Sequence, residues 1–330
     1  MKHSISQALN KAHHQLMEAD ERVIVMGEDI AGGAGLGKGE GLGGVFGVTS
    51  GLADKFGTAR VIDTPISETA FVGMGIGAAM TGLKPIVEVM FCDFMGVCFD
   101  QIFNQAAKVR LLSGGRIAMP MVIRTTLGAG DSSGAMHSQA LQGLLSNVPG
   151  LKIACPSNPA DAGGLLKTAL EDPDPVILME HKGLYDFEGE VELNLSPVPL
   201  GAGRLVREGQ DVTMVALSSM VHVAREVAEG LAQDGIEAEV LDPRTVMPLD
   251  IDLILKSVQK TGKLLVVDES FGFAELVISR VSEEGFGYLQ AAPKKVTPLH
   301  TPIPYAPELE QEWLPSAAQL DTAVRALVGG

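Results

Sequence analysis

The chain has 330 residues, of which 46% are hydrophobic, and this is enough for about two domains with buried cores. Its 41 acidic and 25 basic residues give a formal net charge of −16, which argues against nucleic-acid or membrane-surface partners because these need a basic surface. Gly and Pro, with 39 and 18 copies, follow no short repeat, which excludes collagen-like and disordered classes. No apolar run is long enough to span a membrane.

The three cysteines, Cys92, Cys98 and Cys155, favour neither a disulfide framework nor a structural zinc site. Their number is odd, and their spacing fits no metal-binding pattern. The first residues of the chain alternate polar with apolar side chains, unlike the continuous apolar segment of a secretory signal. We therefore expect buried, reduced cysteines in a cytoplasmic protein.

Alternating strand and helix patterns fill the first half of the chain. The sequence predicts strands at 23–26, 60–63, 85–91, 119–124, 151–154 and 176–179, and helices at 5–16, 69–82, 95–112 and 160–171. The glycine-rich stretch 31–47 is typical of a mobile loop. Residues 186–203 lack helical periodicity and carry turn residues, so they are expected to connect two domains.

The second half repeats the alternation more regularly. The sequence predicts strands at 212–217, 238–241 and 264–267, and helices at 221–234, 250–259 and 273–284. This β-α-β order implies a parallel sheet with helices on both faces. We therefore expect an α/β protein of two domains, at 1–186 and 204–330, joined by a linker at 187–203.

Two glutamates directly follow predicted strands, at the position where parallel sheets bind their ligands. Glu28 comes after the strand at 23–26, and Glu68 follows the strand at 60–63 and heads an apolar helix. Glu68 has two interpretations, a carboxylate that stabilises a helix start or a group that exchanges protons. Its position in the sequence leaves both open.

Histidines give one candidate for acid/base chemistry. His137 lies in a polar stretch after a turn-rich loop at 130–134. It is a candidate acid or base, and the alternative is a solvated loop histidine. His13 and His14 fall on the polar side of the first predicted helix and need no role.

Glycine and aromatic patterns give weaker signals. Residues 32–39 look like a phosphate-binding loop, but no Ser or Thr follows the lysine to bind magnesium. Residues 73–78 fit a loose dinucleotide fingerprint without a preceding strand, so close helix packing explains these glycines better. The aromatic cluster around Phe91 and Phe94 either packs in the core or forms a wall for a flat ring.

Several longer stretches form a recognisable set, namely Asp63–Glu68, Phe91–Lys108, His137–Gln139, Pro149–Lys152, Pro156–Ala162 and Asp242–Thr245. In this order they resemble the beta chains of the thiamine-dependent first component of 2-oxo-acid dehydrogenase complexes. The resemblance runs from about residue 5 to about residue 325. Within the family, 91–108 and 240–245 are most similar to the subgroup of acetoin dehydrogenases.

The resemblance implies a transketolase-like pyrimidine-binding domain followed by a transketolase C-terminal-like, doubly wound domain that mostly serves assembly. Glu68 matches the glutamate that shares a proton with the aminopyrimidine ring of thiamine diphosphate and activates this cofactor. Glu28 matches an acid near that ring, Phe94 the aromatic residue that stacks on it, and Ile66 a backbone contact. His137 matches the histidine that handles protons on the substrate or during acyl transfer.

The resemblance also implies metal ions and an alpha-chain partner. A potassium site, formed mostly by backbone oxygens, matches Met121, Ala169, Leu170, Asp172 and Asp174. The Gly-Asp-Gly motif that binds Mg²⁺ and diphosphate in the superfamily is incomplete here, because Ser132 follows Gly130 and Asp131. An alpha chain is therefore expected to hold the diphosphate and Mg²⁺, in a heterotetramer of two alpha and two beta chains.

The implied function is that of an acetoin dehydrogenase, which cleaves acetoin to acetaldehyde and passes the acetyl unit to a lipoyl acyltransferase. Pyruvate or a branched-chain 2-oxo acid is the alternative substrate. An inactive scaffold is a further alternative, and Glu68, Phe94 and His137 argue against it. An NAD-dependent oxidoreductase is a third, which rests only on the loose glycine fingerprint at 73–78. The chain departs from the family at 270–273, where the family has a longer loop, and at Trp313, where tryptophan is unusual.

Overall fold

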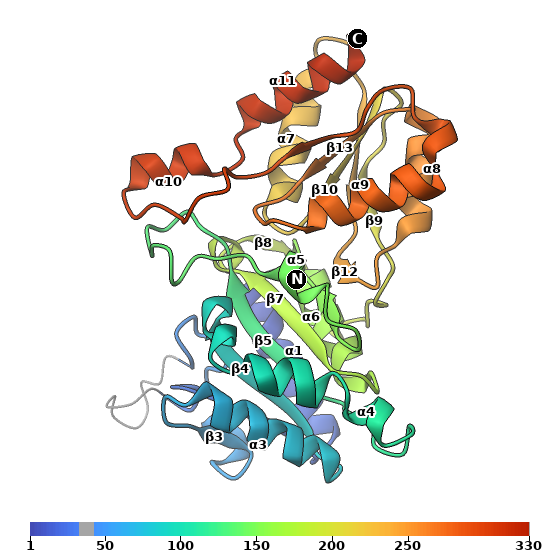
Figure 1. Cartoon of the computed structure of the whole chain (residues 1–330). Coiled ribbons are helices and arrows are strands. Elements are labelled where there is room, and N and C mark those ends of the chain that lie inside the picture. The colour runs from blue at the N-terminus through green and yellow to red at the C-terminus, as the bar shows by residue number, and fades with distance from the viewer. Residues whose placement is uncertain (33–42, 330) are drawn as a thin grey trace. The chain divides into compact units, whose positions relative to one another are not determined.

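The computed structural model describes residues 1–32 and 43–329, which form two compact units (Figure 1). The first comprises the described residues of 1–127 and 147–200, and the second those of 128–146 and 201–330. Each unit has its own sheet and hydrophobic core. Most of the glycine-rich stretch 31–47, with the phosphate-loop pattern, lies outside the described residues.

The main sheet of the first unit is parallel, as predicted. Its strands pair in the order β6, β7, β5, β4, β2 and β3. Their bounds are β2 Val23–Gly27, β3 Val61–Asp63, β4 Lys84–Phe91, β5 Val122–Leu127, β6 Lys152–Ala154 and β7 Val176–His181. The strand predicted at 119–124 begins only at Val122, because Pro120 has no N–H to donate to the ladder.

Helices pack against this sheet (Figure 1). They are α1 Ile5–Ala19, α2 Leu52–Phe56, α3 Glu68–Met80 and α6 Pro159–Glu171, and the short α4 Val109–Leu112 has no buried residue. Ser4 caps α1 through a capping box, and Asn158 caps α6 with Pro159 at its first position, so local signals fix both helix starts. Strand β1 Lys2–Ser4 pairs antiparallel with β8 Glu188–Glu190, and β8 lies within the predicted linker.

The prediction of one continuous helix at 95–112 is wrong. The segment forms a 3-10 turn at Cys92–Gly96, a π-helix at Gln101–Ala106 and then α4. Gly96 is a weak helix former, and the Thr69 hydroxyl donates to the Val97 carbonyl at 2.8 Å, in competition with a regular helical hydrogen bond. π-helical turns are rare and frequently occur at functional sites.

The second unit holds a five-stranded sheet in the order β14, β13, β10, β11 and β9. Its strands are β9 Arg204–Arg207, β10 Val212–Ala216, β11 Ala238–Asp242, β13 Leu264–Val267 and β14 Lys294–Val296, and β12 Thr245–Met247 is a short further strand. All pairs are parallel except β9 with β11. The helices are α5 Gln142–Leu145, α7 Met220–Ala232, α8 Ile251–Thr261, α9 Phe273–Glu284, α10 Pro307–Trp313 and α11 Ala317–Val328.

The strands and helices predicted between 212 and 284 are confirmed, and the α/β class holds for both units. The edge strands β9 and β14 and the helices α10 and α11 were not predicted from the sequence. All three cysteines are buried, as predicted, and none forms a disulfide within the described part of the chain. Among the residues that the structure describes, no helix is long and apolar enough to cross a membrane.

Candidate active site

Glu28 and Glu68 come together at the carboxyl edge of the first sheet. Strands β2 and β3 are parallel neighbours with Gly27 opposite Asp63, so the residues after both strands leave the sheet at the same edge. The Thr64 amide donates to the Gly27 carbonyl at 3.0 Å and ties the turn before α3 to the end of β2. Both glutamates are buried, each with 8% of its surface exposed. The parallel topology thus joins two acids that are far apart in the sequence.

The two carboxyls have different electrostatic surroundings. Burial raises the pKa of Glu28, and the nearby carboxylates of Glu68 and Asp29 raise it further. The Glu28 Oε1 atom is buried and has no hydrogen-bond partner among the described residues. Glu68 is the first residue of α3, where the helix dipole favours negative charge. The pair therefore combines a carboxyl whose charged form is disfavoured with one at a positive helix end.

Phe94 lies at the same edge, in the turn Cys92–Gly96 directly after β4. The hydrogen bond from Thr69 to Val97 joins this turn to the first turn of α3, next to Glu68. Burial and then the charge of Glu68 raise the pKa of the Cys98 thiol to about 12, and this thiol lies 3.8 Å from the Phe94 carbonyl. The structure therefore brings the aromatic residue and the two carboxyls together.

Ile66 stands in the turn between β3 and α3. Its side chain is 85% exposed, so it takes no part in burying Glu68, and the backbone of the turn is what lies beside the carboxyls. Thr64 in the same turn has a buried Oγ1 atom without a hydrogen-bond partner in the described part of the chain. Sequence reasoning missed Thr64, because a single threonine in a turn forms no pattern.

These residues fit a flat, polar heteroaromatic ring. Phe94 supplies an aromatic surface. The buried Glu28 oxygen and the Thr64 hydroxyl offer hydrogen-bonding capacity that no described residue uses. A carboxyl at the Glu68 position can share a proton with a ring nitrogen.

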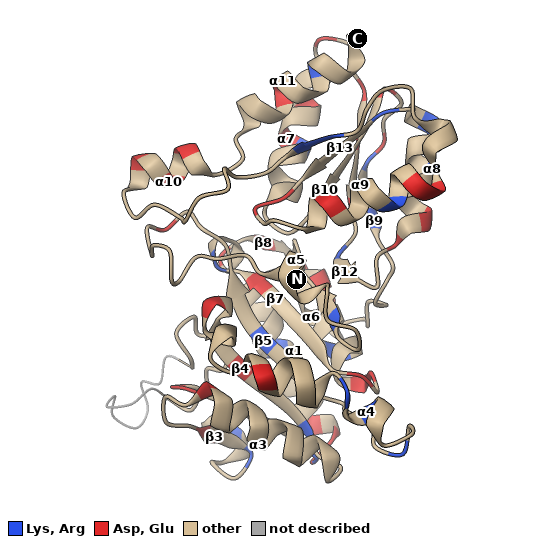
Figure 2. Ribbon diagram, in the orientation of Figure 1, with Lys and Arg blue, Asp and Glu red and all other residues tan. Residues whose placement is uncertain are grey.

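The same edge is unsuited to a phosphate group. Asp29, Asp63 and Asp93 follow or end its strands, in addition to the two glutamates, and acidic residues gather near β3 in Figure 2. Like charges at such short range repel strongly where water is partly excluded. The edge therefore suits the ring of a cofactor and disfavours an anionic tail.

A buried ion cluster braces the strands of the site. Arg124 of β5 donates to Glu180 of β7 at 2.8 and 2.6 Å and to Glu88 of β4 at 2.6 Å. The Tyr185 hydroxyl donates to Glu180 at 2.7 Å. Burial raises the pKa of Glu88 despite the attraction of Arg124. Breaking such a cluster leaves an uncompensated buried charge, at a cost of about 3–5 kcal/mol, so it fixes the strands firmly. This cluster was not predicted from the sequence, although a charged residue such as Arg124 in a mostly apolar strand could have indicated it.

His137 belongs to the second unit. It lies in the segment 128–146, and its amide donates to the Gly134 carbonyl at 3.2 Å within a turn. Its side chain is half-buried. The structure therefore groups Glu28, Ile66, Glu68 and Phe94 in the first unit and places His137 in the second.

The residues predicted to bind potassium lie in the first unit. Lys152 donates to both carboxyl oxygens of Asp172 at 2.7 Å, and Arg110 donates to Asp174 at 2.8 Å. Both aspartate side chains thus have cationic partners, which leaves backbone oxygens as ligands for a further cation. Within residues 1–32 and 43–329, no group of three or more His, Cys, Asp or Glu side chains is arranged to hold a metal.

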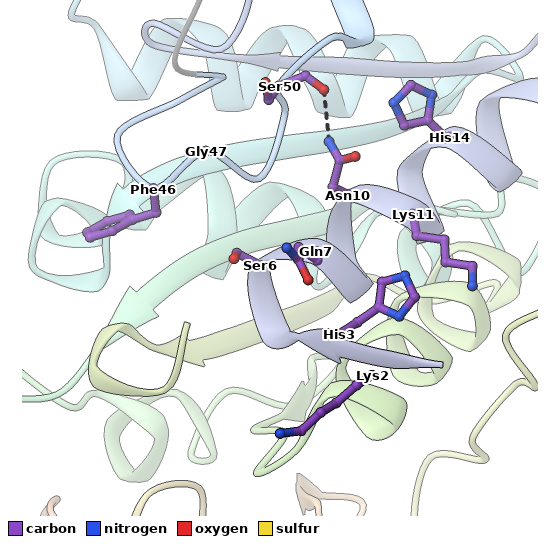
Figure 3. A pocket seen from close by; sticks show the side chains of 10 residues that line it. All are labelled: Lys2, His3, Ser6, Gln7, Asn10, Lys11, His14, Phe46, Gly47 and Ser50. Carbon is purple, nitrogen blue, oxygen red and sulfur yellow. Dashed lines mark hydrogen bonds between the residues drawn. The ribbon is translucent and has the colours of Figure 1, made fainter. Parts of the chain in front are cut away.

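A separate hollow of about 620 Å³ runs along α1 in the first unit (Figure 3). Residues of α1, β1 and 46–50 line it. Asn10 already donates there to the carbonyls of Val48 and Ser50, at 2.8 and 2.9 Å. None of the predicted site residues lines this hollow, so it is not the candidate active site.

Comparison with known proteins identifies the family. Residues 1–188 match the transketolase pyrimidine-binding domain, and residues 201–320 match the transketolase C-terminal domain. A solved structure described as a split-gene transketolase, an inactive beta4 tetramer, has a TM-score of 0.79 over 99% of this chain and 98% of that chain. At 24% identity, this likeness supports the fold.

Closer relatives are beta subunits of dehydrogenases. The beta subunit of acetoin:2,6-dichlorophenolindophenol oxidoreductase from Cupriavidus necator is 51% identical over 99% of this chain and 98% of its own length, and that from Bacillus subtilis is 47% identical over 99% and 97%. The pyruvate dehydrogenase E1 component subunit beta of Rickettsia bellii is 40% identical over 98% of both chains. The chain therefore belongs to the transketolase-like family of beta subunits of acetoin and 2-oxo-acid dehydrogenases.

Proposed function

We propose that this chain is the beta subunit of a thiamine diphosphate-dependent acetoin dehydrogenase. The reaction breaks the bond between the carbonyl and carbinol carbons of acetoin and releases acetaldehyde. The acetyl unit and two electrons pass to the lipoyl disulfide of an acyltransferase. The observation that carries the proposal is the buried pair of Glu28 and Glu68 beside Phe94. Higher identity to the beta subunits of the acetoin oxidoreductases than to that of the pyruvate dehydrogenase favours acetoin over pyruvate.

Each residue of this edge has a task that follows from its surroundings. When bound, thiamine diphosphate supplies a carbon nucleophile and a sink for the electrons of the broken bond. Glu68 holds a proton against the pyrimidine nitrogen, and Phe94 covers one face of the ring. Glu28, whose pKa is raised by burial and by the charge of Glu68, lies beside Glu68 as a second acid close to the ring. The backbone at Ile66 completes the contacts to the ring.

We assign the diphosphate and its Mg²⁺ to an alpha chain. The acidic strand ends around Glu28 and Glu68 repel an anionic group, so the two halves of the cofactor need different protein surfaces. The active site then lies where the beta chain meets the alpha chain, in a heterotetramer of two of each. The three buried cysteines, which form no disulfide among the described residues, suit a reducing cytoplasm.

His137 is assigned to proton transfer on the substrate or to transfer of the acetyl unit. The two ring nitrogens of a histidine can each donate or accept a proton, which suits a group that both takes up and returns one. Its segment carries Ser138 and Gln139, in the order that the family resemblance singles out.

A structural potassium ion belongs to the same proposal. Its ligands are mostly backbone oxygens of Met121, Ala169, Leu170, Asp172 and Asp174. Replacing K⁺ by Na⁺ then lowers the unfolding temperature of the complex. Equal unfolding temperatures in the two salts would remove this part of the proposal.

The experiment uses the beta chain co-expressed with its alpha chain. Glu68→Gln should reduce turnover of acetoin with a dye acceptor by about a hundredfold to ten-thousandfold, because this is the usual contribution of a positioned acid or base to the rate. Glu21→Gln removes the same charge from an exposed position outside the site and should leave turnover unchanged. Gel filtration shows whether each complex assembles. An assembled Glu68→Gln complex with full turnover would contradict the proposed role.

A further inference from the structure

The segment 128–146, which carries His137, is anchored on the second unit by three buried carboxyls. The Ala129 amide donates to Glu269 at 3.4 Å, and the Ser132 amide donates to Glu310 at 2.9 Å. The Gln142 side-chain amide donates to Asp268 at 3.0 Å. These anchors lie on both sides of His137, and in Figure 1 the segment runs beside α10. All three carboxyls are at most 4% exposed.

Close backbone approaches reinforce these hydrogen bonds. A Cβ atom added to Gly143 would lie 1.9 Å from the Phe271 carbonyl oxygen, so only glycine allows α5 to approach 271–272 so closely. Gly134 has φ +75°, and a Cβ atom there would lie 3.0 Å from the Tyr305 ring. The chain on either side of His137 is thus fitted to the surface of the second unit.

Apolar packing and a hollow both adjoin the segment, and Ala129 packs in a small buried cluster with Ile303 and Trp313. A cavity of about 230 Å³ is lined by Ala135 and Gln139, on either side of His137, and by Phe271, Ile303 and Trp313 across from them. Phe271 and Trp313, which belong to the two places where the sequence departs from the family, therefore line the same cavity. The hydrogen bonds to Glu269, Glu310 and Asp268 add specific polar anchors to this packing.

We propose that the C-terminal unit positions His137, with Glu310 as the principal positioning residue and Asp268 and Glu269 as its supports. This inference rests on the role proposed above for His137, and it gives the C-terminal unit a part in catalysis beyond assembly. Glu310 is suited to the task because it is 2% exposed and reaches Ser132 from α10, a separate element. Its second oxygen, Oε1, is buried and has no hydrogen-bond partner among the residues described. The hydrogen bond that Glu310 accepts therefore comes from Ser132, in the segment that carries His137.

The test compares Glu310→Ala, Glu310→Gln and Glu312→Ala in the complex with the alpha chain. Glu312 lies on the same helix with an exposed side chain, so it controls for lost charge. Hydrogen–deuterium exchange should become faster across 128–146 in Glu310→Ala and stay unchanged in Glu312→Ala. kcat/KM for acetoin should fall about tenfold to a hundredfold in Glu310→Ala, since misplacing a reacting group by about 1 Å costs about a hundredfold. Glu310→Gln should recover part of the loss, because its amide oxygen still accepts from the Ser132 amide.

A double-mutant cycle separates positioning from general loss of structure. In a His137→Ala background, Glu310→Ala should cause no further fall in kcat/KM, because its effect passes through the histidine. If the losses of kcat/KM in Glu310→Ala and His137→Ala multiply in the double variant, the inference is overturned. Faster exchange across 128–146 in Glu310→Ala with unchanged turnover would also overturn it. If Glu310→Ala fails to assemble, Glu310→Gln supplies the same cycle with a smaller effect. Full activity of His137→Ala would instead refute the proposed role of the histidine, and the exchange experiment would still show whether Glu310 holds the segment.

Discussion

Replacing Asp268 by Asn should stabilise the second unit at high pH. Asp268 is wholly buried, and burial raises its pKa to about 7 from an ordinary 3.8, with Glu269 adding to the rise. Its hydrogen bonds come from neutral donors, the Ser270 hydroxyl and the Gln142 amide. The carboxyl therefore binds a proton more tightly in the folded than in the unfolded chain.

The sign of the pH effect follows from this difference in proton binding. Between about pH 4 and pH 7 the folded state holds one proton more than the unfolded state, so stability falls as the pH rises through this range and then levels off. Each pKa unit corresponds to about 1.4 kcal/mol, so an ionised Asp268 costs roughly 4 kcal/mol of folding free energy. An Asn residue carries no charge, and its amide can donate to Gln142 Oε1, a buried acceptor without a hydrogen-bond partner in the described residues.

Urea unfolding followed by tryptophan fluorescence measures the free energy of unfolding of the second unit, which contains Asp268. Trp313 is the only tryptophan of the sequence, and it lies buried in the second unit. The stability gained by Asp268→Asn should grow from near zero at pH 4 to roughly 4 kcal/mol at pH 8. Asp252→Asn, at an exposed position of α8, should show no such growth. A difference between Asp268→Asn and wild type that does not change with pH would refute the reasoning.

Two further predictions concern the active site and its supporting helix. His137→Ala should lower kcat for acetoin while leaving the Kd for thiamine diphosphate within about twofold, because the ring site lies in the first unit; a large change in Kd with unchanged kcat would contradict this assignment. In α3, Gly75→Ala places a methyl group 2.6 Å from Val87 and should cost about 1–3 kcal/mol. Gly77→Ala, with open space around the new methyl group, should gain up to about 1 kcal/mol in thermal unfolding; the same effect from both substitutions would contradict the packing argument.

The main sheet and the carboxyl pair could be predicted from the sequence because their signals are local and periodic. Apolar strands followed at once by Glu28 and by the turn before Glu68 place both acids at one sheet edge once the sheet is parallel. Helix α1 was predicted from its apolar spacing, but its buried face is wider than predicted. His13, expected on the polar side, is fully buried with Nδ1 2.7 Å from the Leu9 carbonyl oxygen, and burial lowers its pKa to about 3.

The position of the His137 segment could not be predicted from the sequence. The polar residues that bind it are single residues far away along the chain, and they form no sequence pattern. Ser132 meets Glu310, and Gln142 meets Asp268, across long stretches of sequence and without any periodic pattern. Compact packing assigns 128–146 to the second unit, although it lies within the predicted first domain. Tertiary hydrogen bonds of this kind appear only when the chain is folded.

The central claim is that the beta chain, with its alpha chain, cleaves acetoin through the ring site around Glu68. The most direct measurement supplies the co-expressed complex with thiamine diphosphate, Mg²⁺ and a dye acceptor, and compares acetoin with pyruvate under the same conditions. The account predicts a higher kcat/KM for acetoin, one acetaldehyde released for each dye molecule reduced by two electrons, and no carbon dioxide. Faster turnover of pyruvate with release of carbon dioxide would contradict it.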